Sequence, residues 1–307
     1  MMVLAFSLLL LATLLNTALS ISTSVLSHEK FSFFQFYAVG YLLASLLGGL
    51  VLVRWGRLPA EGLFMLFGVL LLMSVCNMLN MTMHLLSFKY GHNGLTTVIG
   101  NSSSLMTLAF GVFVLGETAS ILSLTGVVFL LTGLTGITLT QVHDKGNSQY
   151  DLRRWALCVI AYWFMSSLVM IASLLTSHVP KPALDTGLRV PILFLETSLF
   201  YFIASPIEKR LQRNPKPLFA FTPKQRVAIL LWSLLAVVQT AVLFLALDEA
   251  NRARISAFFW PLTSGLGLFL FTLYSKWKLR EKYTIPIALS MLSCAIGIVL
   301  IAAGKHI

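Results

Sequence analysis

The chain has 307 residues, of which 57% are hydrophobic and only 11% are charged, whereas soluble domains carry about 25% charged residues. A mean hydropathy of +0.86 agrees with this composition in disfavouring a soluble globular protein. The formal net charge is +11, but the basic residues lie in connectors beside apolar runs, where they meet lipid headgroups. We therefore expect the lipid bilayer as a partner and expect no nucleic acid.

Predominantly apolar runs of about 20 residues recur along the chain, and an α-helix needs that length to span a bilayer. Runs such as Val3 to Leu15 are apolar on nearly every face, unlike the alternating strands of a membrane barrel. The first run lacks the basic residues that open a signal peptide, so we expect a retained helix. The sequence predicts about ten spanning helices, at 3–25, 33–53, 62–86, 94–114, 119–140, 155–175, 188–205, 227–247, 254–274 and 284–303.

A polar linker at 142–154 separates five predicted helices in 1–141 from five in 155–307. The last helix of each half carries two glycines seven residues apart, namely Gly126 and Gly133, and Gly297 and Gly304. This spacing puts both glycines of a pair on one helix face, which is typical of an internal repeat or of close helix packing. Because an odd number of helices inverts the second half, we predict an all-α polytopic membrane protein of two inverted five-helix repeats.

The segment from Val114 to Gly126 reads Val-Leu-Gly-Glu-Thr-Ala-Ser-Ile-Leu-Ser-Leu-Thr-Gly. It resembles the signature that ends each half of EamA-type transporters, with Gly116 and Glu117 at its centre. The resemblance implies membership of the drug/metabolite transporter superfamily and a small metabolite, such as an amino acid, as substrate. It also implies a multi-pass protein of the inner or plasma membrane.

The orientation of the chain has two conflicting indications. The resemblance implies cytoplasmic termini. Most of the 22 Lys and Arg residues, however, lie in the connectors that follow the odd-numbered predicted helices, and the positive-inside rule then puts both termini outside. The orientation is therefore left open.

Glu196 lies between Leu195 and Thr197 in a predicted span, with no Lys or Arg within a helical turn. A charged side chain in mid-membrane costs about 3 kcal/mol, so such a residue is a functional candidate. We interpret Glu196 as a proton-coupling group or as the counter-ion of a cationic substrate. The alternative is a carboxyl that is held protonated, or hydrogen-bonded to a neighbouring helix, for packing alone.

A polar stripe runs along the predicted helix 62–86, where Asn77, Asn80 and His84 stand at positions i, i+3 and i+7. This spacing places two amides and an imidazole on one face of an otherwise apolar helix. The stripe could line a substrate path, with His84 accepting or relaying a proton. The alternative is hydrogen bonding that only holds helices together.

Two predicted helices are interrupted at corresponding places in the halves, which is a pointer to a transporter's binding site. The fourth has a patch of small polar residues around Asn101, which allows close backbone approach or a locally irregular helix, and the ninth has Pro261 directly after Trp260. Ordinary packing and an ordinary kink are the alternatives. Tyr162 and Trp163 could line a cavity or bind an amine through cation–π contacts, or could simply be core.

The sequence contains no Walker loop, zinc signature, nucleophile elbow or Cys/His cluster, so we expect no enzyme activity, cofactor or metal. The leading hypothesis is a secondary transporter that moves a small metabolite by alternating access, with protons as a candidate coupling ion. The alternatives are an intramembrane enzyme or a flippase acting on a lipid-linked substrate, and a structural subunit; a homodimer is left open. The candidate substrate-binding residues are Asn77, Asn80, His84, Asn101, Tyr162, Trp163, Glu196 and Trp260, and the proton-coupling candidates are Glu196 and His84.

Overall fold

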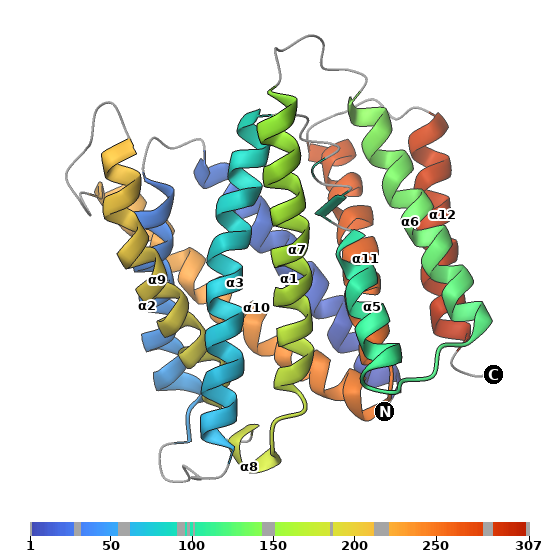
Figure 1. Ribbon diagram of the computed structural model, residues 1–307, viewed down its shortest axis with the longest axis horizontal. Helices are drawn as coiled ribbons and strands as arrows, with labels where there is room; N and C mark the ends of the chain where they lie inside the picture. Colours follow the sequence, from blue (N-terminus) through green and yellow to red (C-terminus); the bar gives the residue numbers. More distant parts are fainter. Residues whose placement is uncertain are drawn as a thin grey trace. The chain divides into compact units, whose positions relative to one another are not determined.

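The computed structural model describes residues 2–27, 32–54, 62–90, 96, 99–100, 102–142, 151–184, 187–211, 221–278 and 285–304. These residues form helices joined by turns, and none of them lies in a strand (Figure 1). The four-residue helix α8 spans Lys181–Leu184. The helices of ten residues or more are α1 Met2–Ser27, α2 Phe33–Leu52, α3 Leu63–Tyr90, α5 Ser104–Phe113, α6 Ile121–Val142, α7 Leu152–Thr176, α9 Arg189–Leu211, α10 Pro223–Arg252, α11 Ser256–Lys278 and α12 Ile285–Ala303.

The predicted all-α class and the ten predicted helices are confirmed, because each of these helices lies at a predicted position. Four helices are long and apolar enough to cross a membrane, which indicates a membrane protein. Their candidate spans are Phe33–Leu52, Leu63–His84, Arg153–Thr176 and Pro223–Arg252. Shorter apolar stretches of 10–17 residues lie in α1, α5, α6 and α12.

Several helices begin at side-chain caps that the sequence encodes locally. Ser32 accepts a hydrogen bond from the backbone N–H of Gln35 at the start of α2. Thr222 and Gln225 form a reciprocal capping box at the start of α10, where each side chain accepts from the other's backbone N–H, and Pro223 takes the first helical position. These caps satisfy backbone donors that have no partner inside the helix.

The chain forms two compact units, each of which combines segments from both predicted halves. Unit 1 comprises 1–14, 79–171 and 246–307, and unit 2 comprises 15–78 and 172–245. The four longest helices, α1, α3, α7 and α10, contribute residues to each unit. The division of the chain into repeats 1–141 and 155–307 with the linker 142–154 stays a prediction.

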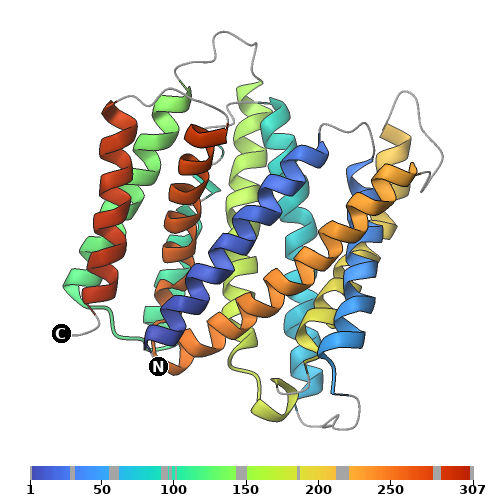
Figure 2. The ribbon, with the colours of Figure 1, turned by 180° about the vertical axis from the view of Figure 1, so that it is seen from behind.

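In unit 1, α6 and α12 lie side by side, at one end of the views in Figures 1 and 2. The glycine faces predicted from the sequence meet there: a Cβ atom added to Gly126 would lie 2.7 Å from the carbonyl oxygen of Gly297. A Cβ atom added to Gly133 would lie 2.5 Å from Sγ of Cys294. The close-packing interpretation of these glycines is therefore confirmed, since no larger residue fits between the helices.

In unit 2, α2 packs against α9 and α10, and serine hydroxyls form hydrogen bonds between α2 and both of these helices. Ser45 donates to the carbonyl of Pro191 at 2.8 Å, and Ser198 of α9 donates to the carbonyl of Ala38 at 2.8 Å. Ser233 of α10 donates to the carbonyl of Gly40, also at 2.8 Å. Such bonds to backbone carbonyls hold apolar helices together where apolar burial alone gives little driving force.

Candidate functional site

The carboxyl group of Glu196 lies in unit 2 beside Ser74 of α3. The Ser74 hydroxyl is 3.4 Å from Oε2 of Glu196 and 3.2 Å from the carbonyl oxygen of Leu193, and it accepts a hydrogen bond from Thr197 at 3.1 Å. Because a hydroxyl has one hydrogen to donate, Ser74 serves Glu196 and Leu193 only in turn. Within the described ranges Glu196 has no ion pair, so its carboxyl has fewer hydrogen-bonding and charged partners there than it can bind.

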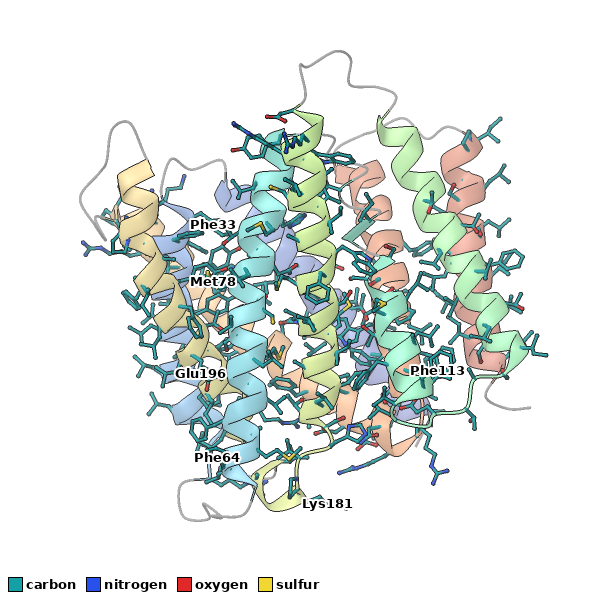
Figure 3. The ribbon with its side chains drawn as sticks, in the orientation of Figure 1. Phe33, Phe64, Met78, Phe113, Lys181 and Glu196 are labelled. Carbon is teal, nitrogen blue, oxygen red and sulfur yellow. The ribbon has the colours of Figure 1, made fainter. Side chains whose placement is uncertain are left out.

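The carboxyl also lies near the middle of a candidate membrane span. Ser74 is 11 residues from the start and 10 residues from the end of the span Leu63–His84, which is about 16 Å and about 15 Å along an α-helix. Figure 3 shows Glu196 on α9 beside α3. The carboxyl of Glu196 therefore lies level with the middle of the α3 span, but α9 is not among the candidate spans found in the described residues, so the mid-span position of Glu196 stays a prediction.

Asn77, one turn after Ser74 on α3, forms a hydrogen bond with Tyr41 of α2. Tyr41 belongs to an aromatic cluster that the sequence analysis missed. Its ring stacks on those of Tyr37 and Tyr201 with centroid distances of 5.6 and 5.9 Å, and the Trp232 ring meets it edge-on at 5.2 Å. The dense aromatic composition of the segment that begins α2 was the available signal.

This aromatic cluster is core rather than an open binding surface. The side chains of Tyr37, Tyr41, Tyr201 and Trp232 are each less than a tenth exposed. The Tyr201 hydroxyl is buried without a hydrogen-bond partner among the described residues. Asn77 is therefore bonded to a packed aromatic core, which favours a structural role for this member of the predicted stripe.

The other two members of the stripe, Asn80 and His84, lie in unit 1. The His84 ring stacks on the Tyr162 ring of α7 at a centroid distance of 4.4 Å and an interplanar angle of 8°. Tyr162 fits closely over Gly100, where an added Cβ atom would lie 2.3 Å from the ring. Asn80, one turn before His84, is only 8% exposed, and its Oδ1 has no hydrogen-bond partner among the described residues.

Helix α7 is also tied to the chain around residues 96–103 in unit 1. The indole N–H groups of Trp155 and Trp163 donate to the hydroxyls of Thr96 and Ser102 at 3.0 and 3.1 Å. Ser103 donates to Ser166 of α7 at 3.0 Å. Two of the six predicted site residues in this unit therefore pack against this segment, Tyr162 through its contact with Gly100 and Trp163 through its bond to Ser102.

The predicted irregularity of the fourth helix is confirmed at Ser103. There the backbone bonds run from Ser103 to Gly100 and from Met106 to Ser103, each over three residues instead of four and each 3.1 Å long. Helix α5 begins only at Ser104, without a side-chain cap. Asn101, the residue chosen from the sequence here, lies outside the described residues.

Trp260 lies on α11 in unit 1, and its ring meets that of Phe259 edge-on at 5.4 Å. Pro261 follows it inside the helix and has no N–H to donate to the preceding turn. The hydroxyl of Thr263 donates to the carbonyl oxygens of Phe259 at 2.7 Å and Trp260 at 3.1 Å. The helix continues through Pro261 without the backbone bond that the proline nitrogen cannot make.

Glu117, which the sequence analysis used only for the family resemblance, has a structural role in unit 1. Gly116 has a φ of 67°, a conformation that favours glycine, and it turns the chain so that Glu117 reaches the start of α11. There its Oε1 accepts from the hydroxyl of Ser256, and its Oε2 accepts from the backbone N–H of Ala257 at 2.9 Å. Glu117 thus caps a helix that follows it by about 140 residues.

The structure therefore groups the predicted site residues by unit. In unit 1 His84 contacts Tyr162, Asn80 lies one turn away on α3, and Trp163 follows Tyr162 on α7. Unit 1 also contains Trp260, on α11, and unit 2 contains Glu196 and Asn77. Within the described ranges no group of three or more His, Cys, Asp or Glu side chains could hold a metal ion.

Comparison with known proteins shows the fold of the chain and nothing finer. No protein-family model and no curated protein matches it. A solved structure described only as "Crystal structure of protein" is similar, with a TM-score of 0.71 and 15% sequence identity. The similarity covers 96% of this chain and 97% of the other. The arrangement of helices is thus shared over the whole chain, at an identity that carries no information on activity.

Proposed function

We propose that the protein is a secondary transporter, with no enzyme activity, which moves a small metabolite across the inner or plasma membrane by alternating access. By its signature segment it is similar to EamA-type members of the drug/metabolite transporter superfamily, and we propose the same plan of two inverted five-helix repeats. The substrate is an amino acid or a related amphipathic solute. Its further partners are the bilayer and protons.

The observation that supports this proposal is the incomplete bonding of Glu196, which is predicted to lie at mid-span. Each oxygen of a carboxylate accepts hydrogen bonds, and a carboxylate that serves packing is stable in a membrane only when both oxygens have donors. Glu117 meets this condition through two donors. Among the described residues Glu196 has one donor, which it shares with a carbonyl, and this deficit supports a partner that arrives and leaves.

A proton and the cationic group of a substrate both neutralise a carboxylate, and they compete for it. Binding of a cationic group at Glu196 therefore releases a proton, and release of that group allows a proton to bind. If the transporter changes sides only when Glu196 is neutralised, this exchange couples substrate movement to the proton gradient. His84, stacked on Tyr162 near Asn80, is the second proton-coupling candidate.

The test is uptake into liposomes that contain the purified protein, with a panel of labelled amino acids and amines, with and without a pH gradient. We expect a gradient to drive uptake in the parent protein and to have no effect on Glu196→Gln. Glu249→Gln is the matched control, because Glu249 is already paired with Arg252 at 2.5 Å, and it should behave as the parent. Uptake that ignores the gradient and survives Glu196→Gln would contradict the proposal.

A further inference from the structure

Helices α5 and α11 pack closely against each other in unit 1 (Figure 1). A Cβ atom added to Gly111, near the end of α5, would lie 2.9 Å from Cα of Ala257, near the beginning of α11. Because the end of one helix meets the beginning of the other, the two helices run antiparallel along their contact. Thr107, one turn before Gly111 on the same face of α5, therefore lies level with Pro261, one turn after Ala257.

The side chain of Thr107 is buried without a hydrogen bond. It is 0% exposed, and its hydroxyl has no hydrogen-bond partner among the described residues. The hydroxyls of Thr132 and Thr263, by contrast, donate to the carbonyl oxygen four residues before them in their own helices. Burying a hydroxyl without a hydrogen bond costs free energy, which indicates that Thr107 binds a group that is not part of the described chain.

A backbone oxygen without its usual donor lies in the same contact. In an unbroken helix the carbonyl of Ala257 accepts from the N–H of the residue four positions later, but that residue is Pro261, which has no N–H. Helix carbonyls point toward the C-terminal end of the helix, so the Ala257 oxygen faces the turn that lies level with Thr107. A hydroxyl oxygen and a carbonyl oxygen therefore offer lone pairs at one level of the α5–α11 contact.

The charge beside these oxygens favours a cation over a neutral ligand. Oε2 of Glu117 accepts from the backbone N–H of Ala257 at 2.9 Å, and among the described residues Glu117 forms no ion pair. In transporters, carbonyl groups that an interrupted helix leaves without donors coordinate sodium ions. The close approach of the two backbones at Gly111 favours a small cation over a large one.

We infer that the contact between α5 and α11 binds a sodium ion, which the hydroxyl oxygen of Thr107 and the carbonyl oxygen of Ala257 coordinate. Water and further oxygens of the turn interrupted by Pro261 complete the coordination. This site goes beyond the proposed function, because it takes an inorganic ion in unit 1, whereas Glu196 lies in unit 2. The bound ion joins α5 to α11 and therefore stabilises unit 1.

The opening of unit 1 in different salts tests this inference without measuring transport. The full-length protein is kept in a neutral detergent with equal concentrations of sodium, potassium or choline chloride. A thiol-reactive reagent then labels Cys294, which is fully buried in unit 1, when that unit opens. Sodium at about 100 times its dissociation constant should slow this labelling about 100-fold relative to choline, and potassium should slow it far less.

Four variants identify the oxygens that bind the ion. Thr107→Val removes the hydroxyl, and Pro261→Ala returns a donor to the carbonyl of Ala257, so each should lower the sodium affinity about tenfold or more. Thr107→Ser keeps the hydroxyl and should keep the sodium effect. Thr132→Val is the matched control, because the Thr132 hydroxyl is exposed and is bonded within α6, and it should behave as the parent.

Equal labelling rates in sodium, potassium and choline would show that water rather than a cation joins the two oxygens, and would overturn the inference. Protection by sodium that persists unchanged in Thr107→Val and Pro261→Ala would place the ion elsewhere and would also overturn it. Binding of radioactive sodium to the parent and to Pro261→Ala gives the same comparison if Thr107→Val does not fold. Neither measurement needs uptake, so the sodium site and the transporter proposal fail separately.

Discussion

Replacing Glu117 with alanine should destabilise unit 1 strongly, although Glu117 lies in a connector. The change removes the acceptor of two donors, the Ser256 hydroxyl and the Ala257 N–H. Ser256 is fully buried, so water does not replace the lost bond. Hydrogen bonds to a charged group contribute about 1.5 kcal/mol each at the low end, and we expect Glu117→Ala to lower the free energy of unfolding by about 3 kcal/mol.

The matched control is Asp151→Ala, which removes an exposed carboxylate cap. Asp151 accepts from the backbone N–H of Arg154 at 3.1 Å at the start of α7, and the loss of such a cap costs about 1 kcal/mol. Glu117→Gln should fall between the two, because an amide oxygen still accepts one bond.

Unfolding by sodium dodecyl sulfate in mixed micelles gives these free energies, with a thiol-reactive dye as the probe. Cys294 lies in unit 1 and is fully buried, so its labelling reports the opening of that unit. A loss for Glu117→Ala no larger than the loss for Asp151→Ala would refute the assignment of Glu117 as the cap of α11.

Two further matched pairs can be measured in the same titration, where labelling of Cys294 reports on variants in unit 1 and labelling of the buried Cys76 reports on variants in unit 2. Gly126→Ala should lower the free energy of unfolding by about 2 kcal/mol, because its Cβ would lie 2.7 Å from a carbonyl oxygen of α12. Gly68→Ala on α3, where a Cβ meets nothing within 4 Å, should raise the free energy of unfolding by about 0.5 kcal/mol. Equal effects of the two changes would contradict the close packing of Gly126. Tyr41→Phe should cost about 1 kcal/mol through the lost bond to Asn77. Tyr201→Phe should be neutral or stabilising, because its hydroxyl has no hydrogen-bond partner among the described residues. The reverse order of the two effects would contradict the described core.

The helices could be predicted from the sequence because a bilayer demands long apolar runs, and these are visible residue by residue. The faces of α6 and α12 could also be predicted, since two glycines seven residues apart leave little choice of packing side. The helix face that each of these glycine faces contacts could not be predicted from the sequence. Gly126 opposes Gly297, and that contact joins the two predicted halves, whereas the sequence alone offered only a similarity between them.

The residue types of the candidate site could be predicted from the sequence, but not which of these residues contact one another. The stripe on α3 was visible at helical spacing, yet Asn77 bonds to Tyr41 in unit 2, while His84 stacks on Tyr162 in unit 1. Helical periodicity fixes the direction of a side chain and contains no information about the residue that it meets. The aromatic core around Tyr41 was missed for the same reason, because its members come from α2, α9 and α10.

Glu117 and Glu196 show how bonding, rather than residue type, separates a structural carboxyl from one proposed to be functional. From the sequence, Glu117 lies in a segment that resembles a known signature, and Glu196 is an acidic residue without a Lys or Arg within a helical turn. In the structure the signature residue accepts from two donors and holds the start of α11. Glu196 shares one hydroxyl with a carbonyl, and that deficit favours a ligand that comes and goes. We therefore expect substitution of Glu117 to change the stability of unit 1, and substitution of Glu196 to change substrate binding and proton coupling.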